Sequence, residues 1–288
     1  MSSKSNILEL TKLMGIDMIR FNDYLDRLSI IKVLSFFLLV MLVLTLSTMA
    51  FDFYLGNLFF KFILYSAMLL FFVYKFHQID LKENSDDSFL VSLRHEYDSI
   101  FEVSNIQSIS FIVIANILFV STIYFILKYL AGLSLISFDS PLFGDFSSLS
   151  AEILLLYFIT VVILSPIIEE LLFRGIFLRR FNKELDNLTL AILITSILFG
   201  LCHGFGGILG AILFGICVSI LYIKSRNILV PIFAHFLNNL ISFLIALAGI
   251  EYFIQGNLIV IVLIVILAIV SNFVLFKAIL KEWPIKME

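Results

Sequence analysis

The sequence predicts an all-α polytopic membrane protein with about eight transmembrane helices. Of its 288 residues, 61% are hydrophobic and only 14% are charged, whereas about 25% are charged in an ordinary soluble domain. The apolar residues fall into long runs, and a helix of about 20 such residues crosses the ~30 Å hydrocarbon core of a bilayer. With so few charges, much of the surface must face lipid, which argues against a soluble enzyme and against a nucleic-acid-binding protein.

Eight apolar segments are candidate spans. The fifth and the sixth are short, so they can also be interpreted as one broken hairpin. The first apolar run starts at about Leu28 and has no small-residue cleavage site, so we expect no signal peptide. In chain order the segments are residues 30–51, 54–76, 109–130, 151–177, 188–203, 207–223, 228–249 and 257–279.

Basic residues predict the orientation of these spans. Lys and Arg are retained on the cytoplasmic side of a membrane, and here they precede the first span or follow the second, fourth, sixth and eighth. Eight spans with both termini in the cytoplasm therefore place nearly every free basic residue inside. The residues concerned are Lys4, Lys12, Arg20, Arg27, Lys75, Lys82, Arg94, Arg179, Arg180, Lys183, Lys224, Arg226, Lys277, Lys281 and Lys286.

The chain divides into four regions. Residues 1–29 carry apolar residues every three or four positions with Asp17, Asp23 and Asp26 between them, which predicts an amphipathic helix. This helix lies either on the inner membrane surface or in the cytosol against the bundle. Residues 30–131 hold three spans and an acidic loop, 80–102, interpreted as a solvated cytoplasmic face. Residues 150–250 hold the candidate catalytic core, and 251–288 hold the last span and a cytoplasmic tail.

Ionisable side chains are concentrated in the spans of the second half. Each costs roughly 2.5–3.5 kcal/mol to insert, so such residues are rare in membranes and usually functional. We therefore expect them to face one another inside the bundle. They are Glu169, Glu170, Arg174, His203 and His235.

Helical spacing predicts which of these side chains meet. Glu170 and Arg174 are four residues apart and can pair on one helix face. Glu169 points about 100° away, toward a different neighbour. His235 shares a face with Asn239, again at a spacing of four.

One carboxylate, two imidazoles and one amide from three helices suit the hydrolysis of an amide. A carboxylate beside an imidazole can deprotonate water, while a second imidazole and an amide N–H can hold the developing oxyanion. Alone, a buried Glu–Arg pair is often only structural, and a lone His is more often a satisfied polar residue. Their occurrence together favours a functional site.

These residues also resemble the motifs of a known family. In order along three apolar spans they are similar to the motifs of the CPBP family, the CAAX protease and bacteriocin-processing (Abi) intramembrane endopeptidases. The resemblance covers roughly residues 150–250 and also implies eight helices. The motifs are Glu169-Glu170-x-x-x-Arg174, Phe199-x-x-x-His203 and His235-x-x-x-Asn239.

The resemblance implies proteolysis at membrane depth, with a role for each motif residue. Glu169 would be the general base, and His203 would help to activate the water. His235 and Asn239 would form the oxyanion hole. No motif position departs from the family pattern.

Two further roles follow from the resemblance. Glu170 and Arg174 would be a supporting pair that fixes the fourth span. No cofactor is expected, although Glu169, His203 and His235 would make a zinc set with an open fourth position. The family was first classed with the metalloproteases and later as glutamate-type, and the paired oxyanion residues favour the metal-free interpretation.

Two prolines and a difference in depth bear on the geometry. Pro166 and Pro231 each free a backbone carbonyl near the predicted site. Counted from the inner ends of their spans at 1.5 Å per residue, His203 lies ~22 Å deep and His235 ~12 Å. A turn after His203 that dips inward would bring the two to one level.

Two other functions remain alternatives. The chain could be a non-proteolytic immunity or regulatory scaffold of the same fold, and intact motifs do not exclude this. A transporter would relay protons through Glu and His, but it predicts matching repeats in both halves. We expect a membrane-embedded or peptide-precursor substrate and a plasma membrane, with the composition favouring a bacterial one, where prenylated CAAX proteins are not expected.

Overall fold

The computed structural model describes residues 21–50, 56–83, 88–138, 146 and 148–282. Throughout these ranges the regular structure is helical, as predicted. The elements are α2 (Phe21–Asp26), α3 (Ile30–Ala50), α4 (Asn57–Glu83), α5 (Phe89–Ile100), α6 (Val103–Gly132), α7 (Ala151–Tyr157), η1 (Phe158–Leu164), α8 (Ser165–Glu170), η2 (Leu171–Leu178), α9 (Arg179–Leu185), α10 (Leu188–Leu201), η3 (Phe205–Gly207), α11 (Ile208–Ser225), α12 (Leu229–Leu247), α13 (Ile250–Gln255) and α14 (Leu258–Glu282).

Seven helices in the described part of the chain are long and apolar enough to cross a membrane. They correspond to all the predicted spans except the fifth. That segment, predicted as 188–203, is a helix of 14 residues, Leu188–Leu201, about 21 Å long and so shorter than the hydrocarbon core. The protein is therefore a multi-pass membrane protein, and eight full spans remain a prediction.

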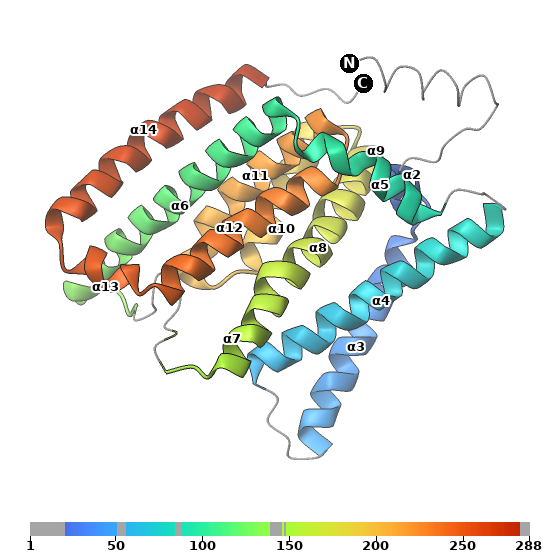
Figure 1. Cartoon of the computed structure of the whole chain (residues 1–288), viewed down its shortest axis with the longest axis horizontal. Helices are drawn as coiled ribbons and strands as arrows, with labels where there is room; N and C mark the ends of the chain where they lie inside the picture. Colours follow the sequence, from blue (N-terminus) through green and yellow to red (C-terminus); the bar gives the residue numbers. More distant parts are fainter. Residues whose placement is uncertain (1–20, 51–55, 84–87, 139–145, 147, 283–288) are drawn as a thin grey trace.

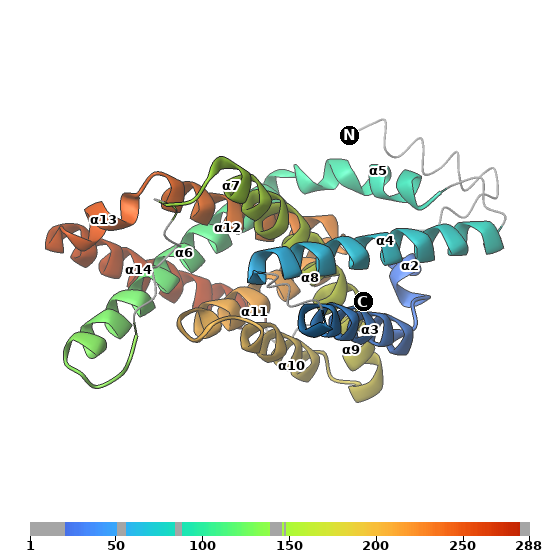
Figure 2. The ribbon, with the colours of Figure 1, turned by 90° about the horizontal axis from the view of Figure 1, so that it is seen from below.

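The longest of these helices, Ala151–Leu185, runs without a break through α7, η1, α8, η2 and α9. In Figure 1 it passes through the middle of the molecule, with α3 and α4 on one side and α6, α11, α12 and α14 on the other. The view from below separates the same two groups (Figure 2). This helix carries Glu169, Glu170 and Arg174, so both groups can reach the predicted site.

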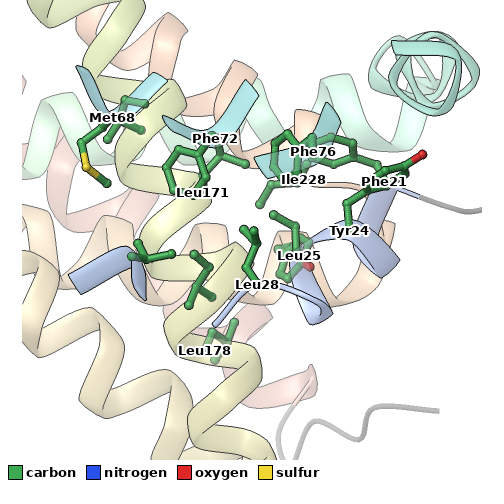
Figure 3. Packing of buried hydrophobic residues seen from close by; sticks show 14 of the residues in the cluster. Phe21, Tyr24, Leu25, Leu28, Met68, Phe72, Phe76, Leu171, Leu178 and Ile228 are labelled. Carbon is green, nitrogen blue, oxygen red and sulfur yellow. The ribbon is translucent and has the colours of Figure 1, made fainter. Parts of the chain in front are cut away.

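A hydrophobic cluster fixes α4 against the central helix. Met68 and Phe72 of α4 are fully buried, and Leu171 of η2 belongs to the same cluster. Figure 3 shows these side chains beside one another, with Phe76 continuing the row toward α2. Burying a side chain of this size contributes roughly 1.5–3 kcal/mol. The cluster therefore holds α4 in place beside α8.

The outer helices present apolar side chains to their surroundings. Leu38 and Leu42 on α3 are more than half exposed, as are Leu258 and Ile269 on α14. Exposed apolar patches of this extent are unusual on proteins that are soluble as monomers. In a bilayer these side chains contact lipid and not water, so their exposure carries no penalty. This agrees with the multi-pass assignment.

The described part of the N-terminal region packs on the bundle. Phe21, Tyr24 and Leu25 of α2 are buried in the same cluster as α4. The Tyr24 hydroxyl donates to Asp80 at 2.6 Å, and burial raises the pKa of Tyr24, so the hydroxyl keeps its proton. For residues 21–26 the packed interpretation is therefore correct; the rest of the predicted amphipathic helix, residues 1–20, lies outside the described residues.

The acidic loop is more ordered than predicted. It contains the end of α4 and the whole of α5, and two of its carboxylates have structural partners. Asp80 accepts from the Phe89 backbone N–H at 3.2 Å, and Glu96 accepts from the Phe21 N–H at 3.2 Å. The interpretation as a merely solvated face was wrong for Asp80 and Glu96, because Tyr24 and Phe21 of α2, which lie 56 and 75 positions away, also donate to these carboxylates.

The helix ends that carry basic residues meet on one side of the bundle. Lys224 at the end of α11 pairs with Glu282 at the end of α14 at 2.9 Å. Arg179 at the start of α9 pairs with Asp26 of α2, and α2 also contacts the end of α4 through Tyr24. This arrangement supports the predicted segregation of charge; the side that faces the cytoplasm remains a prediction.

Candidate functional site

Two π-helical stretches change the register of the central helix around the predicted carboxylates. In η1 each backbone hydrogen bond runs from an N–H to the carbonyl five residues earlier, so the Ser165 N–H donates to the Thr160 carbonyl. The next bond of this series would run from residue 166 to Val161, but Pro166 has no N–H. The Val161 carbonyl instead accepts from Asn239 Nδ2 at 2.9 Å. Pro166 therefore frees a carbonyl at the site, as the sequence predicted, and a motif residue binds it.

Glu170 lies in a fully buried ion cluster. Its Oε1 accepts from Arg174 Nη1 and from His235 Nδ1, both at 2.8 Å. Glu170 and Arg174 are both 0% exposed. Because a buried charge is costly unless it is paired, this contact fixes α12 against the central helix. The predicted pairing of Glu170 with Arg174 is confirmed.

Arg174 extends the cluster to α11 and α10. Its Nη2 donates to the Gly215 carbonyl at 3.1 Å and its Nε to Ser219 Oγ at 3.4 Å. Its guanidinium lies 4.6 Å from the centre of the Phe199 ring. Gly215 permits this approach, since a Cβ there would lie 3.2 Å from Nη2. One side chain thus joins the central helix to α11 and α10.

Glu169 points to a different neighbour, as its helical position predicted. Its Oε1 accepts from the Tyr65 hydroxyl of α4 at 2.8 Å and from Ser165 Oγ one turn earlier. Unlike Glu170, Glu169 is only half-buried, and its two hydrogen-bond donors are uncharged hydroxyls. Two consecutive carboxylates therefore have opposite environments.

His203 lies at the end of α10, beside the Phe199 ring at a centroid distance of 4.7 Å. Its Nδ1 is 2.8 Å from the Phe199 carbonyl oxygen. A carbonyl only accepts, so Nδ1 carries the proton and Nε2 of a neutral ring presents its lone pair. Phe199, the first residue of its motif, thereby sets the tautomer of the motif histidine.

His203 and His235 lie at a similar level in the bundle. Both rings contact Phe199, with His235 at a centroid distance of 5.7 Å. The predicted difference in depth is therefore absent from the arrangement of the two rings around Phe199. A close hairpin of α10 and α11 supports this position: a Cβ on Gly200 would lie 2.3 Å from Ile212 Cγ1, so only glycine fits.

Asn239 ends a chain of amides. Asn116 Nδ2 on α6 donates to Asn238 Oδ1 at 3.0 Å, and Asn238 Nδ2 donates to Asn239 Oδ1 at 3.4 Å. Since Asn239 gives one N–H to Val161, its second N–H remains for another acceptor. His235 and Asn239 both face the central helix, as their spacing predicted.

One feature of the site differs from the expectation. His235 bonds to Glu170, whereas the sequence grouped it with Glu169. Across the described residues, no three His, Cys, Asp or Glu side chains are placed to hold a metal ion. The alternative zinc set of Glu169, His203 and His235 is therefore not assembled, because each side chain is directed to a separate partner.

Three partners of the motif residues were missed by the sequence reasoning. Ser165 lies four residues before Glu169, a spacing that could have indicated contact. Asn116 is a polar residue inside an apolar span, which also gave a signal. The sequence contained no signal for Tyr65, since this residue lies 104 positions from Glu169 in a helix without a motif.

The fold and this cluster define a class of protein: a multi-pass helical membrane protein that buries a polar site among its spans. Residues 151–241 match the family model described as type II CAAX prenyl endopeptidase Rce1-like. Over this segment the chain is therefore similar to the CAAX protease family, as the motifs indicated. The matched family is a family of proteases. No curated protein and no solved structure matches the chain.

Proposed function

We propose that this protein is an intramembrane endopeptidase that hydrolyses a membrane-associated or precursor peptide with water activated by Glu169. The contrast between two consecutive carboxylates carries the proposal. Glu170 is buried and neutralised by Arg174, whereas Glu169 is half-buried and bonded to hydroxyls. Different environments give neighbouring carboxyl groups different roles. Glu169 is the one suited to exchange a proton.

The catalytic step begins with a water molecule beside Glu169. Glu169 takes a proton from the water as its oxygen bonds to the scissile carbonyl carbon, and His203 orients that water through Nε2. The carbonyl becomes a tetrahedral oxyanion. When the intermediate collapses, the C–N bond breaks and the proton held by Glu169 passes to the leaving nitrogen. Such acid–base transfer contributes about 10²–10⁴-fold in rate.

The oxyanion is stabilised by His235 and Asn239. Asn239 offers the amide N–H that Val161 does not use. His235 offers an N–H at Nε2 when both ring nitrogens are protonated, with its Nδ1–H donating to Glu170. One donor of this kind is worth about 10²–10³-fold in rate. The His, Cys, Asp and Glu side chains of the described residues do not form a set that would hold a metal ion.

The substrate follows from location as much as from chemistry. A site among apolar helices suits a peptide that is itself held in or at the membrane. The name of the matched family, a prenyl endopeptidase, makes a prenylated C-terminal peptide one candidate. We also propose a bacterial plasma membrane with both termini in the cytoplasm, where a peptide precursor or the membrane stub of another protein is the better candidate.

The test compares released peptides by mass spectrometry in cells that produce equal amounts of the wild type or Glu169→Gln. We expect a set of peptides with shared cleavage junctions to disappear with the variant. Glu184→Gln is the matched control, since it makes the same change at an exposed position of the same continuous helix. If the peptide profiles of the wild type and Glu169→Gln are identical, while deletion of the protein still gives a phenotype, the protein is a non-proteolytic scaffold and not a protease.

A further inference from the structure

The catalytic carboxylate has a partner outside the protease segment. Tyr65 lies on α4, whereas the family match covers residues 151–241. Its hydroxyl nevertheless donates to Glu169 Oε1 at 2.8 Å. Ser165 Oγ donates to the same oxygen from the central helix itself. Both donors act on one oxygen, and among the described residues no hydrogen bond to Oε2 is found.

Packing holds the Tyr65 ring where this bond requires it. Leu64 and Met68, the neighbours of Tyr65 on α4, are 5% and 0% exposed. They belong to the cluster that joins α4 to the central helix, and Tyr65 packs against it. A side chain locked by packing presents its polar group with little loss of freedom. The tyrosine hydroxyl is thus a fixed donor aimed across a helix interface.

Two donors on one oxygen decide how the carboxylate is oriented. The terminal torsion of Glu is broad and roughly two-fold, so an unrestrained carboxylate rotates easily. Tyr65 and Ser165 hold Oε1 from two directions, and this leaves Oε2 to accept from water. A general base must lie within hydrogen-bond reach of the proton that it removes. Orientation of the carboxylate is therefore part of its activity.

We propose that Tyr65 is a positioning residue of the active site: with Ser165 it holds Oε1 of Glu169 so that Oε2 faces the hydrolytic water. The inference rests on the proposed function of Glu169. It assigns to α4 a share in the reaction, although α4 lies outside the protease segment. Tyr65 acts through Glu169 and not on the substrate, so its loss affects turnover more than substrate binding.

The experiment uses the full-length protein in liposomes and an internally quenched peptide that copies a Glu169-dependent cleavage junction found in cells. Tyr65→Phe removes only the hydroxyl. We expect kcat to fall about tenfold, the equivalent of one hydrogen bond to a charged group, with KM unchanged within about twofold. Ser165→Ala should act in the same way. The double variant should lose at least as much as the two single losses combined, because no donor then remains on Oε1.

Tyr74→Phe is the matched control. It removes a hydroxyl from the same helix, where Tyr74 accepts from Gln78 at 2.6 Å and the side chain is 55% exposed. We expect wild-type kcat and KM. Thermal unfolding in detergent is measured on every variant, since a purely structural role of Tyr65 would lower the stability and leave kcat per folded molecule unchanged.

The outcomes separate the two claims. A normal kcat in Tyr65→Phe, with or without a raised KM, overturns the positioning role. If Glu169→Gln is inactive in the same assay, the proposed endopeptidase function still holds. If Glu169→Gln cleaves as fast as the wild type, or if no Glu169-dependent junction exists, the proposed function fails and the positioning role fails with it.

Discussion

Two neighbouring regions of the site use the same residue type for different purposes. Around Glu170, helices α8, α11 and α12 close on Arg174 and His235 and exclude solvent. Around Glu169, α4 and α8 supply hydroxyls, and the carboxylate stays half-exposed. The comparison teaches that a buried carboxylate surrounded by permanent charges holds the helices together. A carboxylate that is held by neutral donors and is less buried remains available for chemistry.

The largest effect is expected from breaking the buried pair. Arg174→Ala leaves Glu170 charged without its main partner and removes the contacts to Gly215 and Ser219. Removing one partner of a buried pair destabilises a protein by about 3–5 kcal/mol. We expect the variant to be degraded or to unfold at a much lower temperature in detergent.

The matched double variant sharpens this result. Arg174→Met with Glu170→Gln removes both charges and keeps comparable volumes, so it should recover a large part of the lost stability. A double variant as unstable as Arg174→Ala would mean that packing, and not the unpaired charge, explains the loss.

The next largest effect concerns activity alone. Glu169→Gln keeps the shape of the side chain and removes the base, so we expect the rate to fall by about 10²-fold or more. Stability should change by less than about 1 kcal/mol, because the partners of Glu169 are neutral hydroxyls. Cleavage and thermal unfolding are measured on the same preparation. A large loss of stability would contradict the contrast between the two carboxylates.

A smaller effect is expected at the glycine beneath Arg174. A Cβ at Gly215 would lie 3.1 Å from Ser196 Cβ and 3.2 Å from Arg174 Nη2. Overpacking of this kind costs about 1–3 kcal/mol, so Gly215→Ala should unfold at a lower temperature. Gly204→Ala is the control, since no heavy atom lies within 4 Å of its added Cβ. Equal stability of the two variants would show that α11 can move away without penalty.

The smallest effect is expected from the amide chain. Asn116→Leu removes the donor to Asn238, and hydrogen bonds between membrane helices contribute about 0.6 kcal/mol on average. We expect that loss of stability and a reduction of turnover by about threefold, through a less ordered Asn239. Thr122→Val is the control, since the Thr122 hydroxyl donates to the Leu118 carbonyl of the same helix. A tenfold loss of turnover would contradict this indirect role and would mean that Asn116 acts more directly in the reaction.

Much of the site followed from spacing along single helices. The Glu170–Arg174 pair, the divergence of Glu169 and the shared face of His235 and Asn239 are all local, because helical geometry fixes the direction of each side chain. The short α10 was not separable from a span, since hydropathy counts apolar residues and does not show where a helix ends. The order of the acidic loop was missed because its partners come from distant parts of the chain.

The sequence by itself determined that this is a multi-pass helical membrane protein, and its motifs indicated both a resemblance to a protease family and the residues that we propose for its chemistry. These properties depend on composition, on hydrophobic run length and on spacing within one helix. Only the tertiary structure decided that His235 bonds to Glu170 and that Tyr65 reaches Glu169, because these contacts join residues 65 and 104 positions apart. Which carboxylate is enclosed and which stays available depends on how separate helices pack, and no local pattern encodes that packing.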